Sequence, residues 1–140
     1  MHRTQKIGSF WTHISGYKEC QICQTCHTLE SMKHILTFCN ESAVQIIWDM
    51  AKDLWPHRAC LWPKISLGMI LGCESTLIPP MRNNDACHQR NSPRMITRLM
   101  RIIIMELAHL IWSIRCESVI QERQHTEQEI KAKWLWAINK

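Results

Sequence analysis

The chain has 140 residues, of which 46% are apolar and 21% are charged, and its formal net charge is +5. This length and apolar content fit one compact domain and exclude a chain that is disordered throughout. Four glycines argue against glycine-rich nucleotide loops and many-stranded β folds, and three aspartates exclude almost every enzyme that depends on several catalytic aspartates.

Residues 1–40 are expected to form a lead-in and a cysteine-rich segment. The first 19 residues contain no apolar stretch of the length found in secretory signals, so we expect an intracellular protein, in the nucleus or the cytoplasm. In a reducing compartment, eight cysteines favour metal ligation or burial over disulfides.

Four residues of this segment, Cys23, Cys26, His34 and Cys39, follow the pattern C-x2-C-x7-H-x4-C. Zn²⁺ prefers four thiolate or imidazole ligands in a tetrahedron, and a Cys-x2-Cys turn supplies two of them. His34 and Cys39 lie in a stretch with helical character, where five residues rotate by about 500° and leave the side chains about 140° apart. We therefore predict a Zn²⁺ site at which the last helical turn loosens or ends near Phe38.

Two neighbouring residues leave the ligand set open. Cys20 stands at the same spacing from Cys23 as Cys26 does, so Cys20 and Cys23 could chelate in place of Cys23 and Cys26. His27, which follows Cys26, is a further candidate.

Helical periodicity begins after residue 40. Residues 41–78 are expected to form one helix, capped by Asn40 or Ser42 and ended near Pro56, followed by an irregular connector. Residues 79–93 are expected to form a mobile surface loop because they are rich in Pro, Asn and Arg.

Residues 94–140 are expected to form a long helix and a C-terminal helix. Ser92 and Pro93 have the residue types of a helix start, and the long helix should end near Gln121. Thr126 and Glu129 have the spacing of a capping box for the last helix. The expected apolar face of the long helix consists of Met95, Leu99, Ile102, Ile103, Leu107, Leu110, Ile111 and Ile114.

The predicted fold is therefore mainly α, with a small zinc knuckle followed by a helical bundle that contains one long buried helix, all in one compact domain. In the last helix, Trp134 and Trp136 are two residues apart, so one of them should be exposed. The most apolar run, residues 102–114, is too short and too polar to span a membrane, and no membrane association is expected.

Positive charge is concentrated between residues 82 and 101, which contain five arginines and a single acidic residue, an aspartate. Arg94, Arg98 and Arg101 share one helical stripe, and we expect this stripe to lie beside the zinc knuckle. Guanidinium groups in this arrangement suit the phosphates of RNA or DNA. The alternative is a solvated face that balances the acidic residues between 117 and 129. The predicted nucleic-acid-binding residues are Arg90, Arg94, Arg98, Arg101 and Lys33.

The stretch CQTCHTLESMKHILTFC, from Cys23 to Cys39, resembles the reverse-transcriptase zinc-binding domain of non-LTR retrotransposons. The flanking blocks KIGSFWTHISGYKE, IIWDMAKDLW, WPKISLGMILGC, RIIIMELAHLIWSIRCESVI and KWLWAIN look like copies of this element from mushroom-forming fungi, so the resemblance covers nearly the whole chain. It implies Cys23, Cys26, His34 and Cys39 as ligands and makes Cys20 a departure from the pattern. It also implies nucleic-acid handling beside reverse transcriptase and ribonuclease H domains of a longer protein.

Neither of those catalytic domains is recognisable in this chain. Polymerase and ribonuclease H chemistry requires clustered carboxylates that hold two Mg²⁺, whereas Asp49 and Asp53 share one helix face and Asp85 stands alone. Glu106 and His109 are interpreted as a buried structural pair rather than an acid–base site. The remaining cysteines are interpreted as isolated thiols, with a metal site at Cys87 and His88 as a minor alternative: Cys60, Cys73, Cys87 and Cys116.

The sequence therefore predicts a zinc-binding, nucleic-acid-binding module of a retrotransposon protein, without catalytic residues of its own. The alternative is a truncated remnant without function, or a protein-interaction domain that packed on a missing ribonuclease H or polymerase domain.

Overall fold

The computed structural model describes residues 6–56, 61–73, 75 and 93–139, and within these ranges it is mainly helical, as predicted. The described residues form no strand, although Ile22 and Leu29 make one isolated antiparallel bridge. The elements, in chain order, are the 3-10 helices η1 (Gly8–His13) and η2 (Lys18–Gln21), the π-helix η3 (His34–Phe38), and the α-helices α1 (Ser42–Leu54), α2 (Leu67–Leu71), α3 (Pro93–Gln121) and α4 (Glu127–Ile138).

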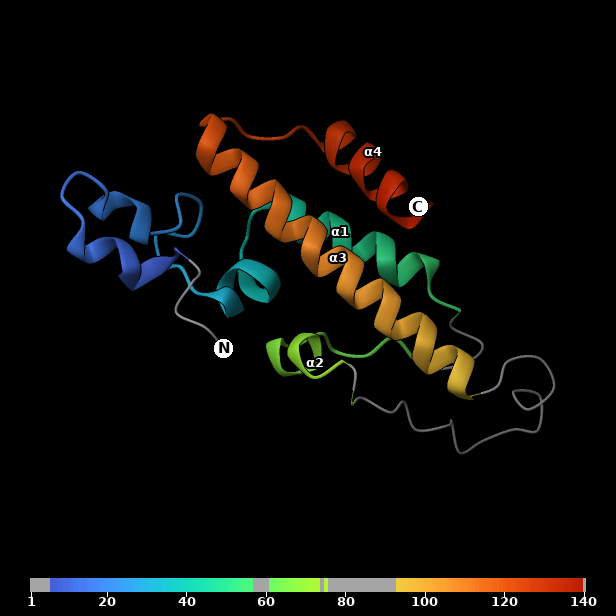
Figure 1. The fold of residues 1–140 in the computed structure, drawn as a ribbon. Coiled ribbons are helices and arrows are strands. Elements are labelled where there is room, and N and C mark those ends of the chain that lie inside the picture. Colours follow the sequence, from blue (N-terminus) through green and yellow to red (C-terminus); the bar gives the residue numbers. More distant parts are fainter. Residues whose placement is uncertain (1–5, 57–60, 74, 76–92, 140) are drawn as a thin grey trace.

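Helix α3 is the axis of the molecule. Its 29 residues give it a length of about 44 Å. Helices α1 and α4 pack against α3 and against each other, whereas the Cys-rich segment, residues 20–40, lies toward the C-terminal end of α3 (Figure 1). The core at the centre of this arrangement consists of Ile47 and Ala51 from α1, Met100, Ile103, Leu107, Ile111 and Ile114 from α3, and Ile130 and Trp134 from α4.

The bounds of α3 agree with the sequence prediction, and its buried face agrees in part. The residues of the predicted face that are buried are Ile103, Leu107, Leu110, Ile111 and Ile114. Met95, Leu99 and Ile102 were expected to be buried and are 63%, 39% and 51% exposed. Ile96 and Ile104 are buried instead. This part of the helix is apolar around most of its circumference, so its periodicity does not select a face, and packing against the neighbouring helices decides which side is covered.

The start of α1 also differs from the prediction. Glu41, and neither Asn40 nor Ser42, occupies the N-cap position, and its side chain makes no capping hydrogen bond. The backbone N–H of Asn40 instead donates to Cys26 Sγ at 3.2 Å, so the cysteine cluster determines the chain path into α1. The helix ends at Leu54, before Pro56, as expected.

The connector after α1 contains a short helix that the sequence did not predict. Helix α2 begins after Ser66, whose hydroxyl accepts a hydrogen bond from the N–H of Met69. In this connector Ile70 is buried and Trp62 and Ile65 pack against the core, whereas Leu61 and Leu71 are exposed. The predicted loop 79–93 lies outside the described residues, apart from Pro93, which begins α3.

Helix α4 agrees with its prediction. The Thr126 hydroxyl accepts from the N–H of Glu129 at 3.3 Å, and the Glu129 carboxylate accepts from the N–H of Thr126 at 2.8 Å, so the capping box is complete. Trp134 is buried and Trp136 is 69% exposed. None of the helices in the described ranges has the length and apolar character needed to cross a membrane.

Candidate metal centre

A tight turn brings Cys23 and Cys26 to one side of the Cys-rich segment. The N–H of His27 donates to the carbonyl oxygen of Cys23 at 2.8 Å, and the N–H of Cys23 donates to that of Thr28 at 2.9 Å. His27 itself adopts a φ of 54°, which reverses the chain direction after Cys26. The turn therefore presents both thiols toward the same point.

The second pair of candidate ligands comes from the π-helix η3. The N–H of Cys39 donates to the carbonyl oxygen of His34 at 2.8 Å, a bond that spans five residues rather than the four of an α-helix. The chain leaves the helix after Phe38, and Cys39 is extended. This wider turn brings the Cys39 side chain to the same side as His34, and it confirms the loosened turn that the ligand spacing predicted.

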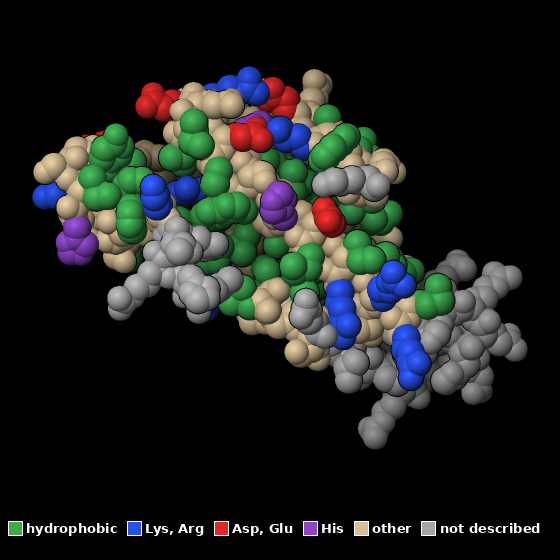
Figure 2. Space-filling model, viewed as in Figure 1, with side chains coloured by type: hydrophobic (Ala, Val, Ile, Leu, Met, Phe, Trp, Pro, Cys, Tyr) green, Lys and Arg blue, Asp and Glu red, His purple; other side chains and the backbone are tan. Residues whose placement is uncertain are grey.

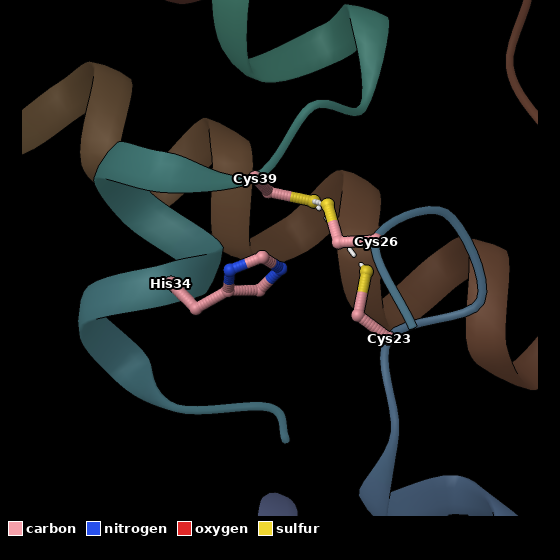
Figure 3. A group of neighbouring side chains, drawn as sticks. All are labelled: Cys23, Cys26, His34 and Cys39. Atoms are coloured by element: carbon pink, nitrogen blue, oxygen red, sulfur yellow. Dashed lines mark hydrogen bonds between the residues drawn. The ribbon is translucent and has the colours of Figure 1, made fainter. Parts of the chain in front are cut away.

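The four predicted ligands lie together. One possible donor atom from each of Cys23, Cys26, His34 and Cys39 lies within 4.8 Å of all the others, and Figure 3 shows the side chains pointing toward one another from the turn and from η3. Cys39 Sγ is 3.6 Å from Cys23 Sγ and 3.8 Å from Cys26 Sγ. Two sulfurs that are each about 2.3 Å from a tetrahedral zinc lie about 3.8 Å apart, so these separations fit a shared ion.

The polar atoms of the cluster also fit a metal. His34 Nε2 is buried and has no hydrogen-bond partner. A buried polar atom without a partner lowers the stability of the fold, and a bound metal ion would supply the missing partner. Burial raises the pKa of the Cys39 thiol far above its usual range, and the adjacent thiols of Cys23 and Cys26 raise it further. A divalent cation at the centre of the cluster reverses both costs, because it accepts the imidazole lone pair and stabilises the thiolates.

Three thiols and one imidazole form a closed set of four ligands. If all four bound one ion, no position would be left for water or substrate, which is typical of structural rather than catalytic metal sites. The N–H of Asn40, which donates to Cys26 Sγ, adds the kind of outer hydrogen bond that supports a ligated thiolate.

The other cysteine and histidine candidates that the structure describes do not belong to this group. Cys20 is half-buried and His27 is exposed, and neither belongs to the cluster of four. Cys73 is buried and Cys116 is half-buried at other places in the fold. Cys60, Cys87 and His88 lie outside the described residues.

A buried ion pair fixes the Cys-rich segment to α3. The guanidinium of Arg115 donates to both carboxylate oxygens of Glu30, and the side chains are only 12% and 9% exposed. Beside this pair, Ile35 lines the same small cavity as Ile111 and Ile114. The sequence does not predict this contact, because no local pattern links residues 85 positions apart.

The structure separates the predicted nucleic-acid-binding residues into two regions. Arg94 and Arg98 are exposed and Arg101 is half-buried near the N-terminal end of α3, whereas Arg90 lies outside the described residues. Lys33 is exposed beside the cysteine cluster, with its ammonium group 5.1 Å from the centre of the Phe38 ring.

These two regions are far apart along α3. Arg94 and Arg98 precede Arg115, which marks the position of the Cys-rich segment, by 17 to 21 residues, or about 25 to 32 Å. The expectation that the arginine stripe lies beside the zinc knuckle was therefore wrong.

Of the other residues considered for catalysis, Asp85 lies outside the described part of the chain, and the remaining ones are exposed or half-buried. His109 is exposed, Glu106 is half-buried, and no hydrogen bond joins them in the described part of the chain, so their interpretation as a buried pair was wrong. Asp49 and Asp53 are exposed on α1.

The chain was compared with family models, with curated proteins and with solved structures, and none of them matches it.

Proposed function

We propose that the chain is a zinc-binding module of a non-LTR retrotransposon protein, which contacts nucleic acid and carries no catalytic site of its own. The observation that carries the zinc proposal is the buried, unpartnered Nε2 of His34 facing three thiols at the separations of a tetrahedral site. Among divalent metals, Zn²⁺ is the one that three thiolates and an imidazole in a tetrahedron suit best. The ion would join the Cys23–Cys26 turn to the end of η3.

Metal analysis of purified protein and of two serine variants tests the zinc site. One equivalent of zinc is expected for the wild type, and Cys23→Ser should lose it because serine does not replace a thiolate ligand. Cys20→Ser is the matched control, since Cys20 lies three residues away and outside the cluster. Loss of zinc in Cys20→Ser together with its retention in Cys23→Ser would overturn the ligand assignment.

The exposed Arg94 and Arg98, on one stripe with Arg101, support the nucleic-acid proposal. No ion pair with a described residue engages Arg94 or Arg98, so both guanidinium groups are accessible to phosphates. Lys33 supplies a further positive charge beside the zinc site. A strand that touched both regions would span about 25 Å or more, roughly eight stacked nucleotides.

Binding of single-stranded RNA and DNA at several salt concentrations tests this proposal. The affinity should fall as salt rises, and Arg94→Ala with Arg98→Ala should reduce the salt slope by about one unit for each arginine removed. Lys131→Ala is the control, because Lys131 is an exposed cation of α4 that pairs with Glu127. Equal effects of the arginine and lysine variants would contradict a specific role for the stripe.

The retrotransposon assignment is supported by the resemblance of the segment from Cys23 to Cys39 and of the flanking blocks. It makes the reverse transcriptase and ribonuclease H domains of a longer protein the expected partners, and it makes this chain a binding module rather than an enzyme. Nuclease and polymerase assays with Mg²⁺ should show no activity. Activity that persists after metal-depleted repurification and reloading with Mg²⁺ would overturn the proposal that the chain is not catalytic.

A further inference from the structure

The N-terminal half of α3 exposes a stripe of large aliphatic side chains to solvent. Met95 is 63% exposed, Leu99 39% and Ile102 51%. At about 100° per residue these three side chains lie within a sector of roughly 60°. Hydrophobic side chains gathered on one helix face in this way mark an interaction site rather than ordinary surface.

A basic stripe runs beside the aliphatic one. Arg94, Arg98 and Arg101 occupy their own sector of roughly 60°, centred about 100° from the first. The exposed Met105 follows the arginines on the same sector of the helix, and no acidic residue occurs between residues 94 and 105. Figure 2 shows Lys or Arg side chains beside hydrophobic ones over this end of the molecule.

The combination favours a protein partner over nucleic acid. Phosphates need only the arginines, and bases stack on aromatic rings, whereas residues 94–105 contain no aromatic side chain. Methionine, leucine and isoleucine at positions i, i+4 and i+7 form a ridge of the kind that packs against another helix. The flanking arginines select carboxylates on that helix.

From this geometry we infer that the face formed by Arg94, Met95, Arg98, Leu99 and Ile102 is the docking site for an acidic amphipathic helix of a partner protein. The partner's apolar ridge covers Met95, Leu99 and Ile102, and its carboxylates meet Arg94 and Arg98. The site rests neither on the zinc centre nor on the retrotransposon assignment. It shares the two arginines with the proposed nucleic-acid contact, so the partner helix competes there with nucleic acid.

A synthetic, fluorescently labelled helical peptide with a leucine ridge flanked by glutamates is the probe, titrated with the zinc-loaded chain of 140 residues in the absence of nucleic acid. It should bind at least about tenfold more tightly than a scrambled peptide or one with lysines in place of glutamates. Leu99→Gln with Ile102→Gln should abolish that difference. Arg94→Glu with Arg98→Glu should reverse the preference toward the lysine peptide.

Ile120→Gln is the matched control, because Ile120 lies on the same helix and is 81% exposed but is remote from these arginines. It should leave peptide binding unchanged, and circular dichroism should show that all variants keep their helical content. The inference is overturned if the scrambled peptide binds as tightly as the probe. It is also overturned if Ile120→Gln weakens peptide binding as much as Leu99→Gln with Ile102→Gln does. Binding of a single-stranded oligonucleotide but of no peptide, undiminished by Leu99→Gln with Ile102→Gln, also overturns it and leaves the nucleic-acid proposal standing.

Discussion

Glu30 and Arg115 form a bidentate ion pair that joins the Cys-rich segment to the middle of the C-terminal half of α3. The Arg115 guanidinium also lies 5.6 Å from the ring centre of Trp112, and its pairing with Glu30 raises its pKa against the lowering effect of burial. Each charge is buried only because the other is present. The pair therefore links the segment that carries the cysteine cluster to α3.

Glu30→Gln should destabilise the fold by about 3 kcal/mol, because it leaves the Arg115 charge buried without its partner. Urea denaturation at a fixed free zinc concentration measures this loss, since bound metal contributes to the apparent stability. Glu122→Gln is the control on an exposed residue and should change the free energy of unfolding by less than about 0.5 kcal/mol. Equal losses in the two variants would show that the ion pair contributes no specific stability.

Of the two glycines that precede the Cys-rich segment, Gly8 should be the less replaceable. It is buried with a φ of 50°, and a Cβ there would overlap the carbonyl oxygen of Glu30. Gly16 also has a positive φ, 85°, but nothing lies within 4 Å of its Cβ position. Gly16→Ala should therefore cost only the backbone strain of about 1 kcal/mol, and Gly8→Ala clearly more. Similar decreases in the melting temperature of the two variants would contradict this close contact.

Zinc affinity should fall steeply with falling pH. Burial raises the pKa of the Cys39 thiol, so this group is protonated at neutral pH without metal, and zinc must displace its proton. With three thiols in the site, the logarithm of the apparent association constant should decrease by up to about three for each unit of pH. Competition with a chromophoric chelator at several pH values measures this slope. A pH-independent affinity would argue against thiolate ligation.

The sequence predicted the ligand group well because its chemistry is local. The spacing of Cys23, Cys26, His34 and Cys39 restricts which side chains can converge, and the mismatch between five helical residues and one ion required the distortion seen in η3. The capping box at Thr126 is likewise determined by residues three positions apart.

The sequence could not predict features that depend on distant partners. Met95, Leu99 and Ile102 have the same apolar character as the buried Ile96 and Ile104, and the packing of α3 against its neighbouring elements decides which set is covered. The ion pair between Glu30 and Arg115 joins residues that no periodicity relates. The same limit applies to the separation of the arginine stripe from the cysteine cluster, which follows from where the Cys-rich segment contacts α3.

Glu117 on α3, which contacts Lys133 on α4, should make the free energy of unfolding depend on pH. Its carboxylate accepts hydrogen bonds from Lys133 Nζ at 2.9 and 3.1 Å and lies 2.9 Å from Nε2 of the buried His125 ring, and these contacts hold its pKa below the ordinary value of 4.5. A carboxyl group whose pKa is lowered by folding stabilises the protein above its unfolded pKa. That contribution is lost as the pH falls through the lowered value.

Glu117→Gln should therefore reduce the free energy of unfolding at pH 7 by less than about 1 kcal/mol, because the carboxylate is more than a third exposed and solvent screens it. The difference from wild type should shrink as the pH falls through the lowered pKa of Glu117, and it should also shrink at high salt. Thermal denaturation of both proteins across this pH range, with Glu122→Gln as the exposed control, makes the comparison. Equal losses of stability in Glu117→Gln and Glu122→Gln at every pH would contradict the prediction that the contacts of Glu117 with Lys133 and His125 stabilise the fold.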